Sequence, residues 1–297
     1  MSATLEWLGC ATFRLEVGAL VVMLDAYLDR VAGAASSGVG VEQIARADWI
    51  AIGHSHFDHL YGAERIALAT GARVVGSYET VRILEAQGVP LAQMIPVAGG
   101  ERIRLSDEVL LSVFPSQHSC VWSAAKLGPS EEVCIGDLGL SWQEQQARLV
   151  ALQQHMGRLG PEVLRHLAIS NQAARGDGGA LVYLFETPEG SLFYQDSSGH
   201  WSGILRDLRP DVAILAAAGR GNVDGEPIQG TLAHFVAREA ELLRARRVIL
   251  SHHDDWLPGF SCAIDVEPVR RELARTRARP ELVALGYADA HPLFARR

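Results

Sequence analysis

Residues 54–59 (HSHFDH) constrain this chain more than any other feature because they place three imidazoles and one carboxylate within six positions. Imidazole nitrogen and carboxylate oxygen bind zinc and related metals, and a catalytic site keeps one coordination position open. His54, His56 and Asp58 are spaced by two, so they would share one side of an extended segment, whereas helical zinc motifs use a spacing of three or four. His59 breaks this alternation and predicts a turn. Four ligands exceed the need of one catalytic ion, so we infer a site for two.

Further candidate ligands each follow a predicted strand, as residues 54–59 follow the apolar run 49–52. Short apolar segments predict strands over 19–24, 109–114, 191–195 and 247–250, and these are followed by Asp25, His118, Asp196 and His252. Strand ends in layered α/β folds collect at one edge of a sheet, so these side chains are expected to converge. Asp25 is interpreted either as a turn residue or as a carboxylate that orients a metal-bound histidine from behind.

The remaining pattern predicts an α/β architecture in which helices cover sheets. Helices are expected over 60–70, 78–87 and 231–246, and strands over 5–15, 73–76, 180–186 and 211–216. Residues 119–170 do not continue this alternation of strands and helices. They are predicted to form a helical insertion, with a capping box at 141–144. Because the insertion follows His118 directly, it is expected to cap the site. The Arg-rich segment from Glu267 onward predicts a surface helix.

Composition narrows the classes of protein that fit. The 297 residues are 48% hydrophobic and 21% charged, which is ordinary for a globular chain, and we predict one domain over 1–297. A formal net charge of -8 disfavours nucleic acid as a partner, and a small-molecule substrate is expected. No secretion signal and no apolar run of membrane-spanning length is visible, so a cytoplasmic protein without a membrane span is expected. A homo-oligomer is compatible with the sequence.

The four cysteines, Cys10, Cys120, Cys134 and Cys262, are scattered without a Cys-x-x-Cys pair. In a cytoplasmic chain they are expected to be reduced, and each is interpreted as a small buried hydrophobic residue. Cys120 is the one that stands out, because it lies two residues from His118.

The order and type of these ligands resemble the metallo-β-lactamase-fold hydrolases, whose motif matches residues 54–59 followed by one downstream His, Asp and His. The resemblance implies an αββα sandwich with metals at one edge. It further implies that His54, His56 and His118 hold the first metal, that Asp58, His59 and His252 hold the second, and that Asp196 bridges them. Residues 7–13 (WLGCATF) look like the branch that contains ascorbate-6-phosphate lactonase and the phospholipase D-type N-acylphosphatidylethanolamine hydrolases. That branch has His at the position of Cys10 and Asp-Pro at the position of Asp25-Ala26.

The predicted function is a dinuclear metal-dependent hydrolase that uses a metal-bound hydroxide on a small ester, lactone or phosphodiester. Two divalent ions, zinc first and manganese or iron as alternatives, lower the pKa of water and stabilise the developing oxyanion. Asp58 and His59 are the predicted catalytic residues, with Asp58 as a proton acceptor. The alternatives are an iron-dependent oxidoreductase on the same fold and a metal-binding protein without catalysis. Diiron reductases of this superfamily tend to have Glu at the position of His56, which counts against the first alternative.

Substrate contacts are expected from polar and aromatic residues near the predicted ligand loops. These are His200, Trp201, Arg220, Asn222 and His253, with His252 preferred to His253 as the metal ligand.

Overall fold

The computed structural model describes residues 3–120, 141–228 and 230–294, which form two large sheets and a small one. The first sheet has seven strands in the order β17-β1-β2-β3-β4-β5-β6. Its first strands form antiparallel hairpins, and β3 to β6 run parallel. The bounds are β1 (Ala3–Gly9), β2 (Thr12–Val17), β3 (Leu20–Leu24), β4 (Trp49–Ala51), β5 (Arg73–Gly76), β6 (Met94–Pro96) and β17 (His291–Pro292).

The second sheet also has seven strands, in the order β16-β15-β12-β10-β9-β8-β7. Strands β7 to β10 are antiparallel, whereas β10, β12, β15 and β16 run parallel. Their bounds are β7 (Arg102–Arg104), β8 (Leu110–Pro115), β9 (Leu181–Thr187), β10 (Gly190–Tyr194), β12 (Val212–Ala216), β15 (Arg247–Ser251) and β16 (Glu281–Val283). A small third sheet consists of β11 (Gly199–His200), β13 (Asn222–Val223) and β14 (Glu226–Pro227).

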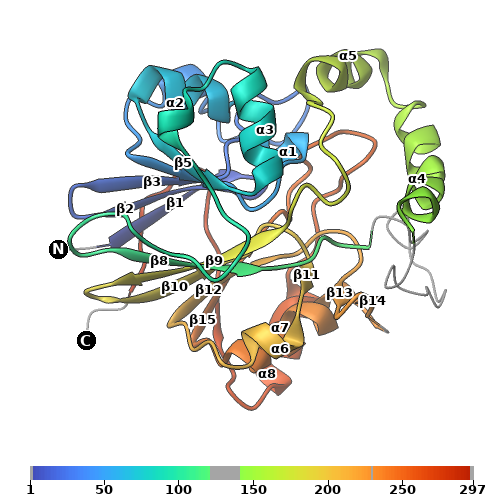
Figure 1. The fold of residues 1–297 in the computed structure, drawn as a ribbon. Coiled ribbons are helices and arrows are strands. Elements are labelled where there is room, and N and C mark those ends of the chain that lie inside the picture. The colour runs from blue at the N-terminus through green and yellow to red at the C-terminus, as the bar shows by residue number, and fades with distance from the viewer. Residues whose placement is uncertain (1–2, 121–140, 229, 295–297) are drawn as a thin grey trace.

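The two large sheets pack face to face, and helices cover both outer surfaces (Figure 1). Apolar residues of both sheets, such as Leu15, Val113 and Tyr194, fill the space between them. The outer face of the first sheet packs against α2 (Ala63–Thr70) and α3 (Tyr78–Ala86), and that of the second against α7 (Leu232–Leu243) and α8 (Glu267–Arg275). Three shorter elements, α6 (Ser202–Leu205), η1 (Val41–Gln43) and η2 (Leu91–Gln93), complete these layers. The predicted α/β αββα sandwich is therefore confirmed.

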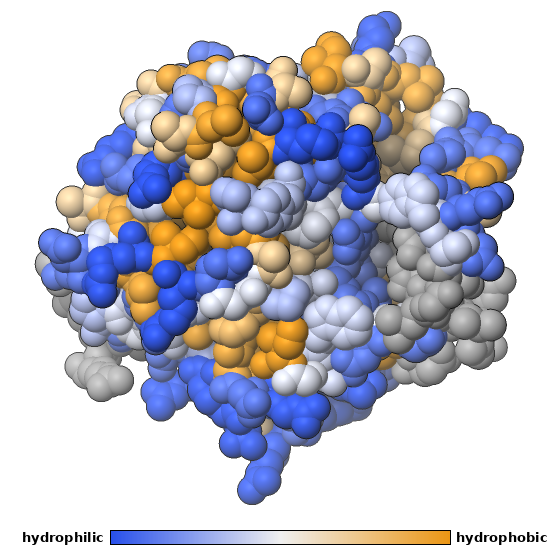
Figure 2. Space-filling model, in the orientation of Figure 1, coloured by the Kyte–Doolittle hydropathy of each residue, from blue (hydrophilic) through white to orange (hydrophobic). Residues whose placement is uncertain are grey.

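The described part of the predicted insertion consists of α4 (Trp142–Met156) and α5 (Pro161–Ser170), which lie beside the sandwich (Figure 1). The expected capping box is present, because Ser141 Oγ accepts from the Glu144 amide and Glu144 Oε2 accepts from the Ser141 amide. Hydrophobic surface is visible over α5 (Figure 2), where Leu164 and Ile169 are exposed. Residues 121–140 of the predicted insertion lie outside the described residues.

Three predicted elements differ in the structure. The strand expected over 5–15 is two strands, because Gly9 and Cys10 adopt positive φ angles of 97° and 48° in the tight turn that joins β1 to β2, and the two strands pair with each other as an antiparallel hairpin. The helix expected over 60–70 is split by Gly62, which has a φ of 108°. The segment after Glu267 contains α8 but also β16 and β17, which are too short and too polar to show an alternating pattern.

Candidate metal centre

Residues 54–59 form a loop that enters the short helix α1 (Phe57–Leu60), with His56 at its N-cap. The prediction that Asp58 shares one extended segment with His54 and His56 is wrong. The amides of His59 and Leu60 donate to the carbonyl of His56, so Asp58 lies in the first helical turn. This turn places His54 and His56 in one group of side chains and Asp58 and His59 in another, and it begins at Phe57, two residues before the position predicted from the sequence.

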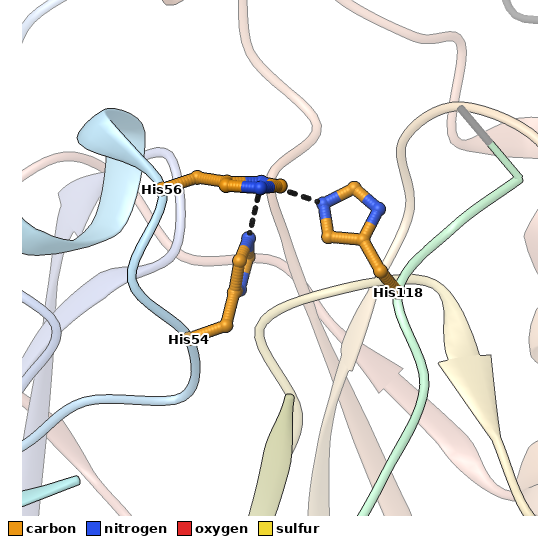
Figure 3. Close-up of side chains that lie close together, drawn as sticks. All are labelled: His54, His56 and His118. Atoms are coloured by element: carbon orange, nitrogen blue, oxygen red, sulfur yellow. Dashed lines mark hydrogen bonds between the residues drawn. The ribbon is translucent and has the colours of Figure 1, made fainter. Parts of the chain in front are cut away.

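The first group brings together three imidazoles, which we call the trihistidine cluster: His54, His56 and His118 (Figure 3). The distance from His56 Nδ1 is 3.2 Å to His54 Nε2 and 3.1 Å to His118 Nε2. His118 follows the end of β8 by three positions. Histidines separated by 62 residues therefore face one another at the edge of the sandwich.

The outward-facing nitrogens of this cluster all meet hydrogen-bond acceptors. His54 Nδ1 lies 2.6 Å from Asp196 Oδ2, His56 Nε2 lies 3.1 Å from the carbonyl of Gly176, and His118 Nδ1 lies 2.9 Å from the carbonyl of Ser119. A neutral imidazole has one N–H, so these contacts assign the proton to the outward nitrogen and leave a lone pair on the inward one. Three lone pairs that face each other at this distance fit a cation between them, which is the geometry a metal ligand set requires.

Burial favours the neutral form of two of these rings. Burial, followed by the charges of His59 and His56, lowers the pKa of His54 well below its usual value of 6.5. Burial also lowers the pKa of His56. A neutral ring is the form that binds metal, so the environment of this cluster favours ligation over protonation.

The second group, which we call the carboxylate cluster, contains Asp58, His59 and His252. Asp58 Oδ2 lies 3.1 Å from His252 Nε2 and 3.5 Å from His59 Nε2. Although burial raises the pKa of the Asp58 carboxyl, the neighbouring His59 and His252 outweigh burial and hold that pKa well below its usual range. An ionised carboxylate with two imidazoles also forms a suitable ligand set for a divalent ion.

Two buried carboxylates support these ligands from behind. Asp25 Oδ2 lies 2.6 Å from His59 Nδ1 and accepts from the hydroxyl of Tyr194 at 2.7 Å, while Asp25 Oδ1 accepts from the amide of Gly53 at 2.9 Å. This is the position expected of a residue that orients His59, and it directs His59 Nε2 toward Asp58. Burial and the adjacent Asp196 raise the pKa of Asp25 to about 6.

Asp196 contacts histidines of both clusters. Its Oδ2 lies 2.6 Å from His54 Nδ1 and 3.3 Å from His59 Nδ1, on the side of the rings that faces away from the other ligands. Gly53 permits this approach, because a Cβ at that position would lie 2.2 Å from Asp196 Cγ. Asp196 thus joins the two clusters, and the bridging of two metals remains a prediction.

A cavity of about 110 Å³ opens beside both clusters. Its polar wall includes Asp58, His59, His118, Asp196 and His252, and its apolar wall includes Trp256, Phe260 and Ile264. The residues that line it, among those the structure describes, include neither lysine nor arginine. The predicted ligands therefore face a small space whose opposite side is apolar.

The five residues predicted to contact substrate do not line this cavity. His200 is buried against Glu239, with His200 Nδ1 3.1 Å from Glu239 Oε1, and it stacks on Phe235. His253 stacks on Trp7 at a centroid distance of 4.4 Å. Both rings pack against other aromatic side chains and neither lines this cavity, so their role in substrate binding stays a prediction.

The other three predicted contacts are likewise absent from the lining of this cavity. Arg220 is buried and donates to the carbonyl of Ile228 at 3.0 Å. Asn222 donates to the carbonyl of His118 at 3.0 Å, so it holds the backbone of a predicted ligand. Trp201 forms the N-cap of α6. Their neighbours in sequence, such as Ser198 and Gly219, line the cavity instead.

Several residues at the site were not found from the sequence. Phe260 and Ile264 line the cavity from a segment without a recognisable motif, and Tyr194 supports Asp25 from inside a strand. Cys10 lies beside Asp58 and His252, although Cys120 seemed the more notable cysteine. The thiol of Cys120 instead lies 3.8 Å from the carbonyl of Gly221. One feature of the sequence indicated that Cys10 lies near the site: the lactonase-containing branch that residues 7–13 resemble has His at this position.

Comparisons with known proteins agree with this fold. The sequence profile described as "Beta-lactamase superfamily domain" matches residues 21–138. A UPF0173 metal-dependent hydrolase of Pyrobaculum arsenaticum is 35% identical over 115 residues, which are 39% of this chain and 50% of that protein. The chain thus spans about half the length of the curated relatives it matches.

Solved structures extend the likeness to the whole sandwich. Igni18, a metallo hydrolase from the hyperthermophilic archaeon Ignicoccus hospitalis, matches with a TM-score of 0.62 and 14% identity over 98% of each chain. An isothiocyanate hydrolase from Delia radicum gut bacteria matches with a TM-score of 0.59 and 15% identity over 97% of this chain and 98% of its own. The likeness to this superfamily thus extends over residues 21–138 in sequence and over the whole sandwich in fold, while the branch stays a prediction.

None of the helices in the described parts of the chain is both long and apolar enough to cross a bilayer.

Proposed function

We propose that this protein is a metal-dependent hydrolase that holds two divalent ions, zinc in the first instance, and cleaves a small neutral ester or lactone. The observation that carries this proposal is the convergence of the inward nitrogens of the trihistidine cluster, at 3.1 and 3.2 Å, beside a second ligand set around Asp58. The relatives named as metal-dependent hydrolases support the same class.

In this proposal each cluster holds one ion. His54, His56 and His118 bind the first, Asp58, His59 and His252 bind the second, and Asp196 contacts a histidine of each set. Divalent ions in such a site supply Lewis acidity and make water more acidic. The chain itself orients the ligands through Asp25 and Asp196, and Asp58, which lines the cavity, accepts a proton from the attacking water.

The lining of the cavity favours a neutral substrate. Sites that bind phosphate esters commonly use arginine or lysine to hold the phosphate oxygens, and the described residues around this cavity include neither. Trp256, Phe260 and Ile264 offer apolar surface opposite the ligands, which fits the hydrocarbon part of an ester or lactone. The phosphodiester alternative is thus the less supported one.

We further propose that residues 1–297 act as one domain in which the insertion forms part of the wall above the site. Leu159 and Val163 of the insertion pack in the same apolar cluster as Trp256, which lines the cavity. His166 Nε2 of α5 lies 2.9 Å from the hydroxyl of Tyr27. These contacts connect the insertion to the side of the sandwich that carries the ligands.

The test combines metal content with a hydrolysis panel. Protein loaded with zinc is expected to contain two equivalents and to cleave neutral aryl esters or lactones faster than bis(p-nitrophenyl) phosphate. His56→Ala is expected to lose metal and activity, whereas the matched control His234→Ala, whose imidazole is half exposed on α7, is expected to retain both.

Two results would overturn the proposal. Fewer than one equivalent of zinc, manganese or iron after metal-replete expression would exclude a metal enzyme. Full activity in His56→Ala would show that hydrolysis does not depend on the trihistidine cluster. Faster cleavage of the phosphodiester than of the neutral esters would leave the proposed hydrolase activity in place and contradict the proposed neutral substrate.

A further inference from the structure

Cys10 lies at the carboxylate cluster, although it is distant from the other ligands in sequence. Its side chain is fully buried, and its Sγ, a carboxylate oxygen of Asp58 and a ring nitrogen of His252 all lie within 4.8 Å of one another. These are three donor atoms from three separate segments of the chain. Thiolate, carboxylate and imidazole together form a ligand set that zinc, cobalt and iron accept.

The backbone holds Cys10 in this place at a conformational cost. Its φ of 48° is uncommon for a residue with a side chain. The amide of Cys10 donates to Asp254 at 3.1 Å, and its carbonyl accepts from the amide of His252 at 2.8 Å and from Trp7 Nε1 at 3.0 Å. The bond to His252 directly couples the position of the thiol to that of a predicted ligand.

His252 has a similar conformation, with a φ of 61°. The residue is only 8% exposed, and the Nδ1 atom of its ring has no hydrogen-bond partner among the described residues. Strained residues that meet from different segments are typical of functional sites, and a buried ring nitrogen without a partner indicates that protein contacts alone do not satisfy this cluster.

We propose that Cys10 is a thiolate ligand of the metal ion held by Asp58 and His252, which gives this ion a nitrogen, oxygen and sulfur environment. The inference rests on the proposed function, because it requires that the carboxylate cluster binds metal. Coordination replaces the S–H bond with a bond between sulfur and metal, and the proton passes to the solvent. The competing interpretation is a small buried thiol that only donates to the carbonyl of Asp58, which lies 3.6 Å from Sγ.

Cobalt substitution tests this proposal without relying on activity. The full chain is loaded with Co²⁺, the bound cobalt is counted, and the near-ultraviolet absorption is searched for a charge-transfer band from sulfur to cobalt. We expect the native sequence to show the band. We expect Cys10→Ser to lose the band while the trihistidine cluster still binds its full equivalent of cobalt. The matched variant Cys120→Ser/Cys134→Ser/Cys262→Ser leaves Cys10 as the only cysteine of the four, and it is expected to retain the band.

The possible outcomes separate the two proposals. Full cobalt uptake without the band, or a band that persists in Cys10→Ser, overturns the role of Cys10 and leaves the proposed function intact. Absence of cobalt uptake by the native sequence overturns both. If Cys10→Ser does not fold, zinc X-ray absorption of the variant with Cys10 as its only cysteine decides the matter: a sulfur neighbour at about 2.3 Å supports the proposal, and its absence overturns it.

Discussion

The trihistidine cluster and the carboxylate cluster lie side by side but are built differently. His56 and His118 are half-buried, and both are held from outside by backbone carbonyls. Asp58, His59 and His252 are buried and are held by carboxylates and a strained backbone. One cluster thus consists of imidazoles, of which only His54 is fully buried and held by a carboxylate, whereas the other contains the Asp58 carboxylate and is buried throughout.

This difference predicts different behaviour toward metal. Anionic ligands attract a cation more strongly in a buried site than in an exposed one, because water screens the charge less. The carboxylate cluster is therefore expected to hold its ion more tightly, and the trihistidine cluster to exchange its ion faster. Charge and burial, rather than the number of ligands, distinguish the two halves.

The largest expected effect comes from removing one ligand of each cluster. His56→Ala and His252→Ala should each lose about one of two metal equivalents. The affinity for that metal should fall by more than the roughly 10- to 100-fold loss that follows when a residue supporting a ligand is replaced. Metal analysis after dialysis measures this loss. Loss of both equivalents in both variants would show that the clusters act as one site and would break the comparison.

The next largest effect concerns the buried ion pair behind Cys10. Arg30 Nη1 lies 2.8 Å from Asp254 Oδ2, and the two side chains are 2% and 4% exposed. Arg30→Met leaves the Asp254 carboxylate buried without its partner, so the free energy of unfolding should fall by about 3–5 kcal/mol. Urea denaturation provides the measurement, and metal should be lost first from the carboxylate cluster.

Arg65→Met is the matched control for this change. Arg65 pairs with Asp29, but both side chains are about a third exposed. Solvent screens such a pair, so its loss should cost less than about 1 kcal/mol. Equal destabilisation by the two variants would contradict the interpretation that the Arg30 pair supports the site.

A smaller effect is expected at the carboxylate that orients His59. Asp25→Asn keeps the size of the side chain but replaces the charge that lies 2.6 Å from His59 Nδ1. Metal affinity of the carboxylate cluster should fall about 10- to 100-fold, while that of the trihistidine cluster changes less. Competition with a chromophoric chelator measures both affinities. An equal loss at the two clusters would indicate that Asp25 supports the site as a whole.

The smallest effect concerns pH. Burial alone would raise the pKa of Asp254, but Arg30 and the bonds from Cys10 and Tyr287 outweigh burial and lower that pKa below its usual value of 3.8. A lowered pKa in the folded state means that Asp254 stabilises the protein above pH 3.8, and that this contribution is lost as the pH falls through the folded value.

Comparison with Asp254→Asn isolates this contribution. The difference in unfolding free energy between the metal-free native sequence and this variant should be constant from about pH 5 to 7 and should shrink below the ordinary carboxyl pKa of about 4. A difference that instead grows under acid conditions would show that Asp254 is not held as the ionised partner of Arg30.

The fold and most of the cluster members could be predicted because their signals are local. Strands such as β3 and β12 are continuous apolar runs, and residues 54–59 carry their spacing within a single loop. Strand ends then indicated where His118, Asp196 and His252 would meet, because layered folds gather such ends at one edge. The two short strands near the C-terminus lacked such a signal.

The sequence by itself determined the types of ligand and their order, since these depend on side-chain chemistry and on strands that the chain encodes locally. Only the tertiary structure decided that Asp58 turns away from His54 through α1, that His200 packs against Glu239, and that Cys10 reaches the carboxylate cluster. These outcomes depend on contacts between distant segments, such as the bond from the His252 amide to the Cys10 carbonyl. No local pattern reports such contacts, because their energy arises only once the two sheets have packed together.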